Sequence, residues 1–115
     1  MTTRALREPE LSPVIDPLHV ARTSRERTRG LLDRGSLEDG EGMWFPRCRL
    51  VHTFGMKFSI DLVYLTGELE VCKVVRGLGP GRLSACLGAE SLIELKCGAA
   101  EKLGLSRGVK LRILE

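Results

Sequence analysis

The sequence predicts a mostly β domain, that is, a β-rich α+β fold with a small curled antiparallel sheet or barrel and two short helices. The chain of 115 residues has 13 glycines and 5 prolines, which favours many turns and short strands over a helical bundle. Several segments alternate apolar and polar residues with the period of two that is typical of strands. Aromatic residues are few, namely one tryptophan, one tyrosine and three phenylalanines, so the core must be aliphatic.

The chain is expected to contain a lead-in followed by one domain. Residues 1–17 contain three prolines and show no periodicity, which indicates an extended or frayed segment. Residues 18–115 are expected to form a single β-rich domain, because a chain of this length fits one domain.

The first half of this domain shows two strands and a helix. A short strand begins at Leu18. A short helix follows over residues 23–32, because a capping-box pattern opens it. Residues 33–42 have the composition of a loop, and a short strand follows over residues 43–45.

The second half alternates strands and turns. Residues 52–65 predict one long strand or two, and a tight turn at Thr66 and Gly67 joins them to a partner strand over residues 68–75. The remaining elements are a glycine-rich excursion, a strand, a short helix and a closing strand, over residues 76–85, 91–97, 98–104 and 108–114.

The stretch HTFGMKFSIDLVYL, residues 52–65, has two different faces. One face is polar: it carries Lys57, Ser59 and Asp61, which are too polar for a closed core. We therefore expect an open, polar mouth there, which Arg82 reaches from the glycine-rich segment, as a site for a small polar ligand. The apolar face is expected in the core and consists of Phe54, Met56, Phe58, Ile60, Leu62 and Tyr64.

The alternative is a structural ion pair across strands. Lys57 and Asp61 lie about 13 Å apart along a straight strand, so they cannot pair directly. Glu94 is the candidate partner of Lys57, and Arg82 or Arg76 is the candidate partner of Asp61. The candidate ligand-binding residues are therefore Lys57, Ser59, Asp61, Arg82 and Glu94.

No residue is assigned a catalytic role. The chain has only two histidines, and Ser59 lies in no GxSxG motif, so a serine triad is not indicated. Cys48 and His52 are about 13 Å apart in an extended segment, too far for the imidazole to activate the thiol. The four cysteines include no CxxC pair, so we expect no metal, no cofactor and four free, buried thiols.

Charge and hydropathy limit the partners. The net charge of +3 comes from 18 basic and 15 acidic residues, a balance that indicates no polyanion such as a nucleic acid. The arginine-rich residues 22–29 lack interleaved aromatics, which favours a solvated helix face. No segment resembles a signal peptide or a membrane span, so we expect no membrane partner and a cytoplasmic location as given, with export of a longer precursor left open. The oligomeric state is not indicated.

Five motifs occur in an order that resembles an uncharacterised prokaryotic family called domain of unknown function 192. They are RTRGLL (27–32), EGMWF (41–45), TFGMKFSIDLVYL (53–65), GPGR (79–82) and IELKCGAAEKLGL (93–105). The resemblance covers about residues 18–114. It implies a compact β-rich fold and brings no established activity.

The family pattern carries over to several positions of this chain. The resemblance places Phe54, Met56, Lys57, Asp61, Glu94, Leu95 and Gly98 at matched positions. Gly55 stands before Met56 where many members have tryptophan, and Ser59 stands where proline is common. Only three residues separate Lys57 from Asp61, where many members have a longer insert, so the chain looks like a shorter subgroup of this family.

Three functions fit these observations. The first is a non-enzymatic binding or accessory module with a polar site around Lys57, Asp61 and Arg82, for an unknown small polar ligand or protein partner. The second is a small hydrolase or transferase with Asp61 or Glu94 as general base, which would need a raised pKa in a closed cleft. The third is a homo-oligomeric structural protein joined through an edge strand over residues 91–97.

Overall fold

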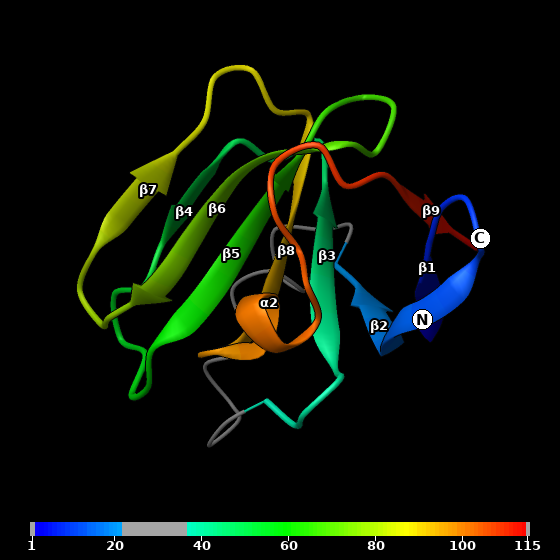
Figure 1. Cartoon of the computed structure of the whole chain (residues 1–115). Helices are drawn as coiled ribbons and strands as arrows, with labels where there is room; N and C mark the ends of the chain where they lie inside the picture. The colour runs from blue at the N-terminus through cyan, green and yellow to red at the C-terminus, as the bar shows by residue number, and fades with distance from the viewer. Residues whose placement is uncertain (1, 22–36, 115) are drawn as a thin grey trace.

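The computed structural model describes residues 2–21 and 37–114, which contain nine strands and one short helix. These are β1 (Thr2–Arg7), β2 (Ser12–Val20), β3 (Gly42–Pro46), β4 (Leu50–His52), β5 (Ile60–Leu65), β6 (Val71–Leu78), β7 (Leu83–Ala85), β8 (Ser91–Lys96), α2 (Ala99–Lys102) and β9 (Leu111–Ile113). Seven strands form one sheet in the order β6-β5-β8-β3-β2-β1-β9, and β4 and β7 form a separate two-stranded ribbon (Figure 1). The prediction of a mostly β fold is confirmed, but the described residues contain one short helix rather than two. The helix expected over residues 23–32 lies outside them.

The large sheet is curled but does not close into a barrel. Its strands pair antiparallel, except that β2 and β3 run parallel. In the described chain its two edges, β6 and β9, are linked by an isolated bridge between Glu70 and Lys110. Beside this bridge, the Val71 N–H donates to the Val109 carbonyl at 2.8 Å. The two edges meet only through this bridge and a few backbone bonds around it, and β9 has only 3 residues, so the described sheet does not close into a barrel.

Residues 2–7 and 12–17 lie in strands of the sheet and are not an extended lead-in. β1 pairs with β2 and also with the last strand, β9. Two of the prolines that argued against regular structure, Pro13 and Pro17, lie within β2. They are tolerated because β2 pairs with β3 only from Leu18 to Val20, so the part that holds the prolines lies outside this second ladder.

Both faces of the central strands are buried. All 6 residues of β5 are buried, so β5 is not the half-exposed strand that an apolar and polar alternation predicts. On one face, Val63 and Leu65 pack in a cluster with Ala99 and Ala100 of α2, the helix that lies in front of the sheet in Figure 1. On the other face, Ile60, Leu62 and Tyr64 belong to a second cluster. The expectation that the face with Asp61 opens into a polar mouth is therefore wrong within β5.

The residues between β4 and β5 form turns rather than a continuous strand. Gly55 has a φ of 83°, a left-handed conformation that glycine adopts without a steric penalty. Because the chain turns here, Phe54 is 51% exposed, and its predicted place in the core is wrong. Met56 and Ile60 are buried in one cluster, as predicted.

The strand predicted over residues 91–97 is confirmed as β8, and it occupies the middle of the sheet. β8 pairs with β5 on one side and with β3 on the other. It therefore has no free edge, and the idea that it joins copies of the chain as an edge strand is wrong. The short helix predicted over residues 98–104 is confirmed as α2.

All four cysteines are free, as predicted. Cys48 is buried, whereas Cys72 and Cys86 are half-buried and Cys97 is exposed. The expected burial of the thiols therefore holds for Cys48 and is wrong for Cys97.

The core assignment leads to a stability prediction. Ile60→Ala should lower the free energy of unfolding by about 2–5 kcal/mol, because truncation of a fully buried side chain leaves a cavity. Leu87→Ala is the matched control and should change it by less than about 0.5 kcal/mol, since Leu87 is 85% exposed. Urea unfolding followed by circular dichroism measures both values, and an unchanged midpoint for Ile60→Ala would contradict the assignment.

Candidate functional site

Asp61 is a fully buried acid whose carboxylate accepts three backbone hydrogen bonds. Its Oδ1 accepts from the Gly77 N–H at 2.9 Å. Its Oδ2 accepts from the Gly98 N–H and the Ala100 N–H, each at 3.0 Å. The carboxylate thereby joins β5 to the end of β6 and to the start of α2.

The backbone around Asp61 is shaped by glycines. Gly77 and Gly98 have φ values of 65° and 91°, a left-handed conformation that other residues adopt only with strain. Asp61 forms no ion pair among the described residues, so its predicted pairing with Arg82 or Arg76 is wrong. Since it is also buried, Asp61 does not line an open mouth. Its observed role is to bind backbone N–H groups.

Glu94 is a second buried acid, and it lies on the opposite face of the sheet. It is 3% exposed and lies across from Met43 in β3 and Leu62 in β5. Its Oε2 has no hydrogen-bond partner in the described structure. Burial raises the pKa of Glu94 to about 8, so most of it is protonated at neutral pH. Lys57 is exposed and forms no ion pair with the described residues, so the predicted Lys57–Glu94 pair is wrong.

Thr53 ties the glycine-rich segment to the turns before β5. The Thr53 hydroxyl donates to the Gly79 carbonyl at 2.6 Å and accepts from the Arg82 N–H at 2.8 Å. The Thr53 N–H also donates to the Arg82 carbonyl at 2.9 Å. A Cβ atom on Gly79 would lie 3.8 Å from the Ser59 Oγ. Ser59 therefore lies close to the glycine-rich segment that contains Arg82.

The five predicted ligand-binding residues do not converge on one hollow. Asp61 and Glu94 are buried on opposite faces of the sheet. Lys57 and Arg82 are exposed, and Ser59 is half-buried. Ligand binding by these last three residues stays a prediction.

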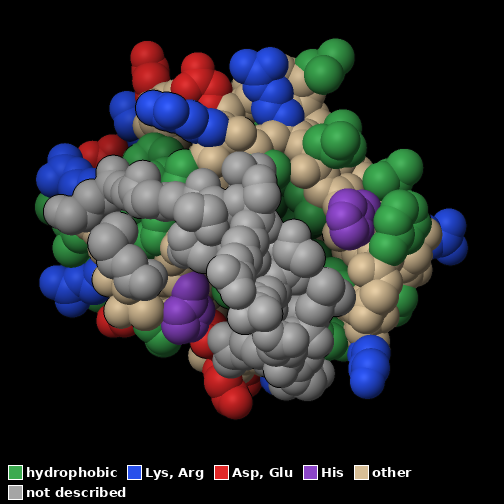
Figure 2. All heavy atoms as spheres, turned by 180° about the vertical axis from the view of Figure 1, so that it is seen from behind, with side chains coloured by type: hydrophobic (Ala, Val, Ile, Leu, Met, Phe, Trp, Pro, Cys, Tyr) green, Lys and Arg blue, Asp and Glu red, His purple; other side chains and the backbone are tan. Residues whose placement is uncertain are grey.

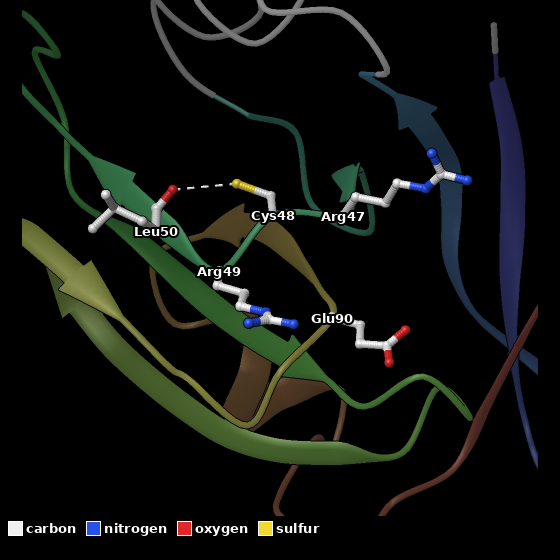
Figure 3. A pocket seen from close by; sticks show the side chains of 5 residues that line it. All are labelled: Arg47, Cys48, Arg49, Leu50 and Glu90. Carbon is white, nitrogen blue, oxygen red and sulfur yellow. Dashed lines mark hydrogen bonds between the residues drawn. The ribbon is translucent and has the colours of Figure 1, made fainter.

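A different hollow, with a volume of about 540 Å³, opens beside the connection from β3 to β4 (Figure 3). Its lining residues are Arg47, Cys48, Arg49, Leu50 and Glu90, and it is termed the arginine hollow. Backbone bonds hold this lining in place: the Cys48 N–H donates to the Glu90 carbonyl at 3.1 Å, and the Cys86 N–H donates to the Arg49 carbonyl at 3.0 Å. The hollow is thus attached to the segment that leads into β8.

The charged side chains of the arginine hollow are not paired with one another. Figure 3 shows the Arg49 side chain extending in the direction of Glu90, and the Arg47 side chain extending elsewhere. No ion pair of the described residues involves any of the three. The Glu90 carboxylate lies against Gly67, where a Cβ atom would approach it to 2.9 Å. The lining of the hollow therefore includes residues of both charges, and the Glu90 carboxylate lies beside Gly67.

The thiols near this region are poor nucleophiles. The buried Cys48 thiol donates to the Leu50 carbonyl at 3.2 Å. Burial raises the pKa of the Cys72 thiol, and the adjacent Cys86 raises it further. A raised pKa reduces the thiolate fraction at neutral pH, and the thiolate is the reactive form.

Potential metal ligands and the length of the helix bear on metal binding and on membrane crossing, within the residues that the structure describes. No group of three or more histidine, cysteine, aspartate or glutamate side chains among them is placed to hold a metal ion. None of the helices in the described ranges is long and apolar enough to cross a bilayer.

Sequence reasoning missed both the arginine hollow and the role of Thr53. The segment RCRL at residues 47–50 gives a local signal, two arginines around a cysteine without a nearby acid. Glu90 follows about forty residues later, and no spacing rule connects it to this segment. Thr53 gives no signal, because a threonine in a turn is ordinary.

Comparisons with known proteins agree with this fold. The family model of DUF192, described as "Uncharacterized ACR", matches residues 11–113. The crystal structure of a protein of unknown function from Novosphingobium aromaticivorans DSM 12444 has a TM-score of 0.83 and 22% identity, and the match covers 96% of this chain and 84% of that chain. The crystal structure of a candidate transcription regulator from Sinorhizobium meliloti 1021 has a TM-score of 0.85 and 16% identity. This match covers 98% of this chain and 94% of that chain. No curated protein matches. At these identities the likeness shows a shared fold alone.

The hydrogen bonds of Asp61 lead to a second stability prediction. Asp61→Asn should lower the free energy of unfolding by about 3 kcal/mol, because an amide NH₂ group cannot accept the backbone N–H bonds. Lys57→Met should change it by less than about 0.5 kcal/mol, since Lys57 is exposed and unpaired among the described residues. Urea unfolding compares the two variants, and an equal loss in both would argue against this account.

Glu94 should make stability depend on pH. Its pKa is about 8 in the folded protein, against an ordinary value of 4.5, so the folded state keeps a proton that the unfolded state releases. The stabilisation present below the ordinary pKa is therefore lost as the pH rises through the folded pKa. Glu94→Gln removes this titration, so the unfolding free energy of the wild-type chain should fall relative to the variant by roughly a few kcal/mol between about pH 5 and pH 8.

Urea unfolding at several pH values measures this difference. Glu68→Gln is the control, because Glu68 is exposed and its replacement should leave the wild-type pH dependence intact. Parallel curves for the wild-type chain and Glu94→Gln would show that Glu94 is ionised in the folded protein.

Proposed function

Because this chain belongs to the DUF192 family, which is described as uncharacterised, we propose a function from its own geometry: a non-enzymatic binding module that holds a small polar ligand in the arginine hollow. The supporting observation is that Arg49 and Glu90 line one hollow of about 540 Å³ without forming an ion pair. Side chains of opposite charge at one site are available to a ligand when they do not neutralise each other.

The chemistry of the hollow suggests a ligand class. A guanidinium group binds a carboxylate or a phosphate through parallel N–H bonds, and Arg49, whose side chain extends in the direction of Glu90, supplies one. The Glu90 carboxylate accepts hydrogen bonds and favours an ammonium or amide N–H group. A small molecule with an anionic group and a nitrogen donor, such as an α-amino acid, fits both requirements. Leu50 adds an apolar wall for its carbon atoms.

An enzymatic function has less support. Both carboxylate oxygens of Asp61 already accept backbone hydrogen bonds, so Asp61 is poorly placed to act as a base. Glu94 has a pKa of about 8, which suits a general acid or base, but it does not line the arginine hollow. The Cys48 thiol donates its hydrogen to a carbonyl and is buried. Binding without catalysis is therefore the better supported proposal.

Binding can be tested with three small probes that separate the two charges. Glycine carries both charged groups, acetate the negative one and methylammonium the positive one. In ¹H–¹⁵N NMR titrations, glycine should shift the amide signals of Cys48, Arg49 and Glu90 more than either fragment does. Its Kd should be on the order of millimolar, as expected for so few atoms in an open hollow.

Variants locate the site. Arg49→Gln and Glu90→Gln should each weaken the glycine response, whereas Arg4→Gln and Glu68→Gln, which alter exposed residues outside the hollow, should preserve it. If acetate moves the amide signals as far as glycine does, Glu90 does not contribute to binding. No response to any probe would reject the proposed ligand class.

A further inference from the structure

Exposed hydrophobic side chains gather on the ribbon formed by β4 and β7. Six large hydrophobic residues of the described chain are exposed, and four of them lie on the ribbon or in the turns that flank it. These four are Leu50 (62% exposed), Phe54 (51%), Leu83 (64%) and Leu87 (85%). Figure 2 shows hydrophobic side chains around a histidine on the side of the molecule where β4 and β7 lie. A cluster of exposed apolar groups of this kind marks an interaction site.

The register of the ribbon explains why these residues share one face. Leu50 pairs with Ala85, and His52 pairs with Leu83, so their side chains point to the same side. The residues between them face the protein: Val51 packs against a core cluster, and the Ser84 Oγ lies 2.8 Å from the Tyr64 hydroxyl, which donates to it. The Phe54 ring stacks on the His52 ring with centroids 5.1 Å apart. The ribbon face is defined as the outer side with Leu50, His52, Phe54 and Leu83, together with the exposed Leu87 in the turn that follows β7.

The two segments that carry the ribbon face are basic, although the acid Glu90 lines the arginine hollow together with Leu50. Residues 47–57 and 79–88 contain Arg47, Arg49, Lys57 and Arg82 and no acidic residue. These segments carry a formal charge of +4, whereas the whole chain carries +3, so the remainder carries −1. All four basic residues are exposed and have no ion pair in the described part of the chain. An apolar centre with a charged rim is the usual layout of a protein interface.

We propose that the ribbon face docks a partner protein, through a segment that combines apolar side chains with aspartate or glutamate. The apolar groups of this segment cover Leu83 and Leu87, and its carboxylates meet the basic rim. This interaction goes beyond the binding of a small ligand: it shares Leu50, Arg47 and Arg49 with the arginine hollow, but Leu83 and Leu87 do not line that hollow.

Charge and chemistry disfavour the other occupants. A second copy that used the same face would bring two basic rims together, and like charges at an interface repel. Nucleic acid bases stack on aromatic rings, but three of the four exposed apolar residues are leucines, and the Phe54 ring is already stacked on His52. A lipid surface offers anionic groups but no fixed pattern of charges that would match Arg49, Lys57 and Arg82 on different loops.

A random 12-residue peptide library displayed on phage tests the proposal. The wild-type chain should enrich peptides that are both acidic and apolar. Synthetic versions of these peptides should bind Leu83→Ser/Leu87→Ser at least about tenfold more weakly, because the apolar centre is lost. Arg82→Glu should also weaken them, and more so at low salt.

The matched control is Leu114→Ser, which removes an exposed leucine (37% exposed) beside β9, and its affinity should stay within about twofold of the wild type. Thermal melts confirm that each variant folds, as expected for exposed positions. Failure to enrich peptides, enrichment of basic peptides, or equal binding to the double leucine variant would overturn the proposal. Stronger binding to phosphatidylglycerol vesicles or to a 20-nucleotide single strand, or self-association in ultracentrifugation that the double variant abolishes, would overturn it in favour of that occupant.

Discussion

The arrangement of this domain depends on one buried carboxylate. Asp61 lies in the middle of the most apolar part of the chain, and its two oxygens accept N–H groups from the end of β6 and from the start of α2. A buried carboxylate is tolerated only when it is well hydrogen-bonded, and here backbone donors do this without a basic side chain. The same bonds fix where β6 ends and where α2 begins. Through α2, they also determine which part of the sheet is covered.

The two buried acids at the centre of the sheet are stabilised in different ways. Asp61 is surrounded by N–H donors, so its hydrogen-bonding capacity is used. Glu94, one strand away on the other face, has an oxygen without a described partner, and burial keeps it protonated. The first arrangement determines the path of the chain, because the donors belong to its backbone. In the second arrangement, a protonated, neutral Glu94 side chain lies in an otherwise apolar cluster.

Much of the fold could be predicted from local pattern, and the site could not. The alternation in residues 91–97 and the glycines around the short helix gave β8 and α2, because these signals lie within a few residues of each other. Asp61 was misread as a mark of solvent, since its donors lie 16 to 39 positions further along the chain and are backbone groups. Residues 2–17 were misread because prolines are permitted where β2 lacks a second ladder, which only the tertiary structure reveals. The arginine hollow requires Glu90 to reach Cys48, a contact with no sequence signature.

The position of β8 bears on how the chain acquires its structure during synthesis. β8 lies between β3 and β5 although it follows both in the sequence. A growing chain that has not yet reached Ser91 can form the β5–β6 hairpin and the β1–β2–β3 group, but no ladder joins them. Each piece then presents an unpaired edge of apolar residues, the kind of surface on which nascent chains aggregate. Pairing of the two pieces is therefore postponed until β8 has been synthesised, and a pause in translation before Ser91 prolongs the interval in which both edges are exposed.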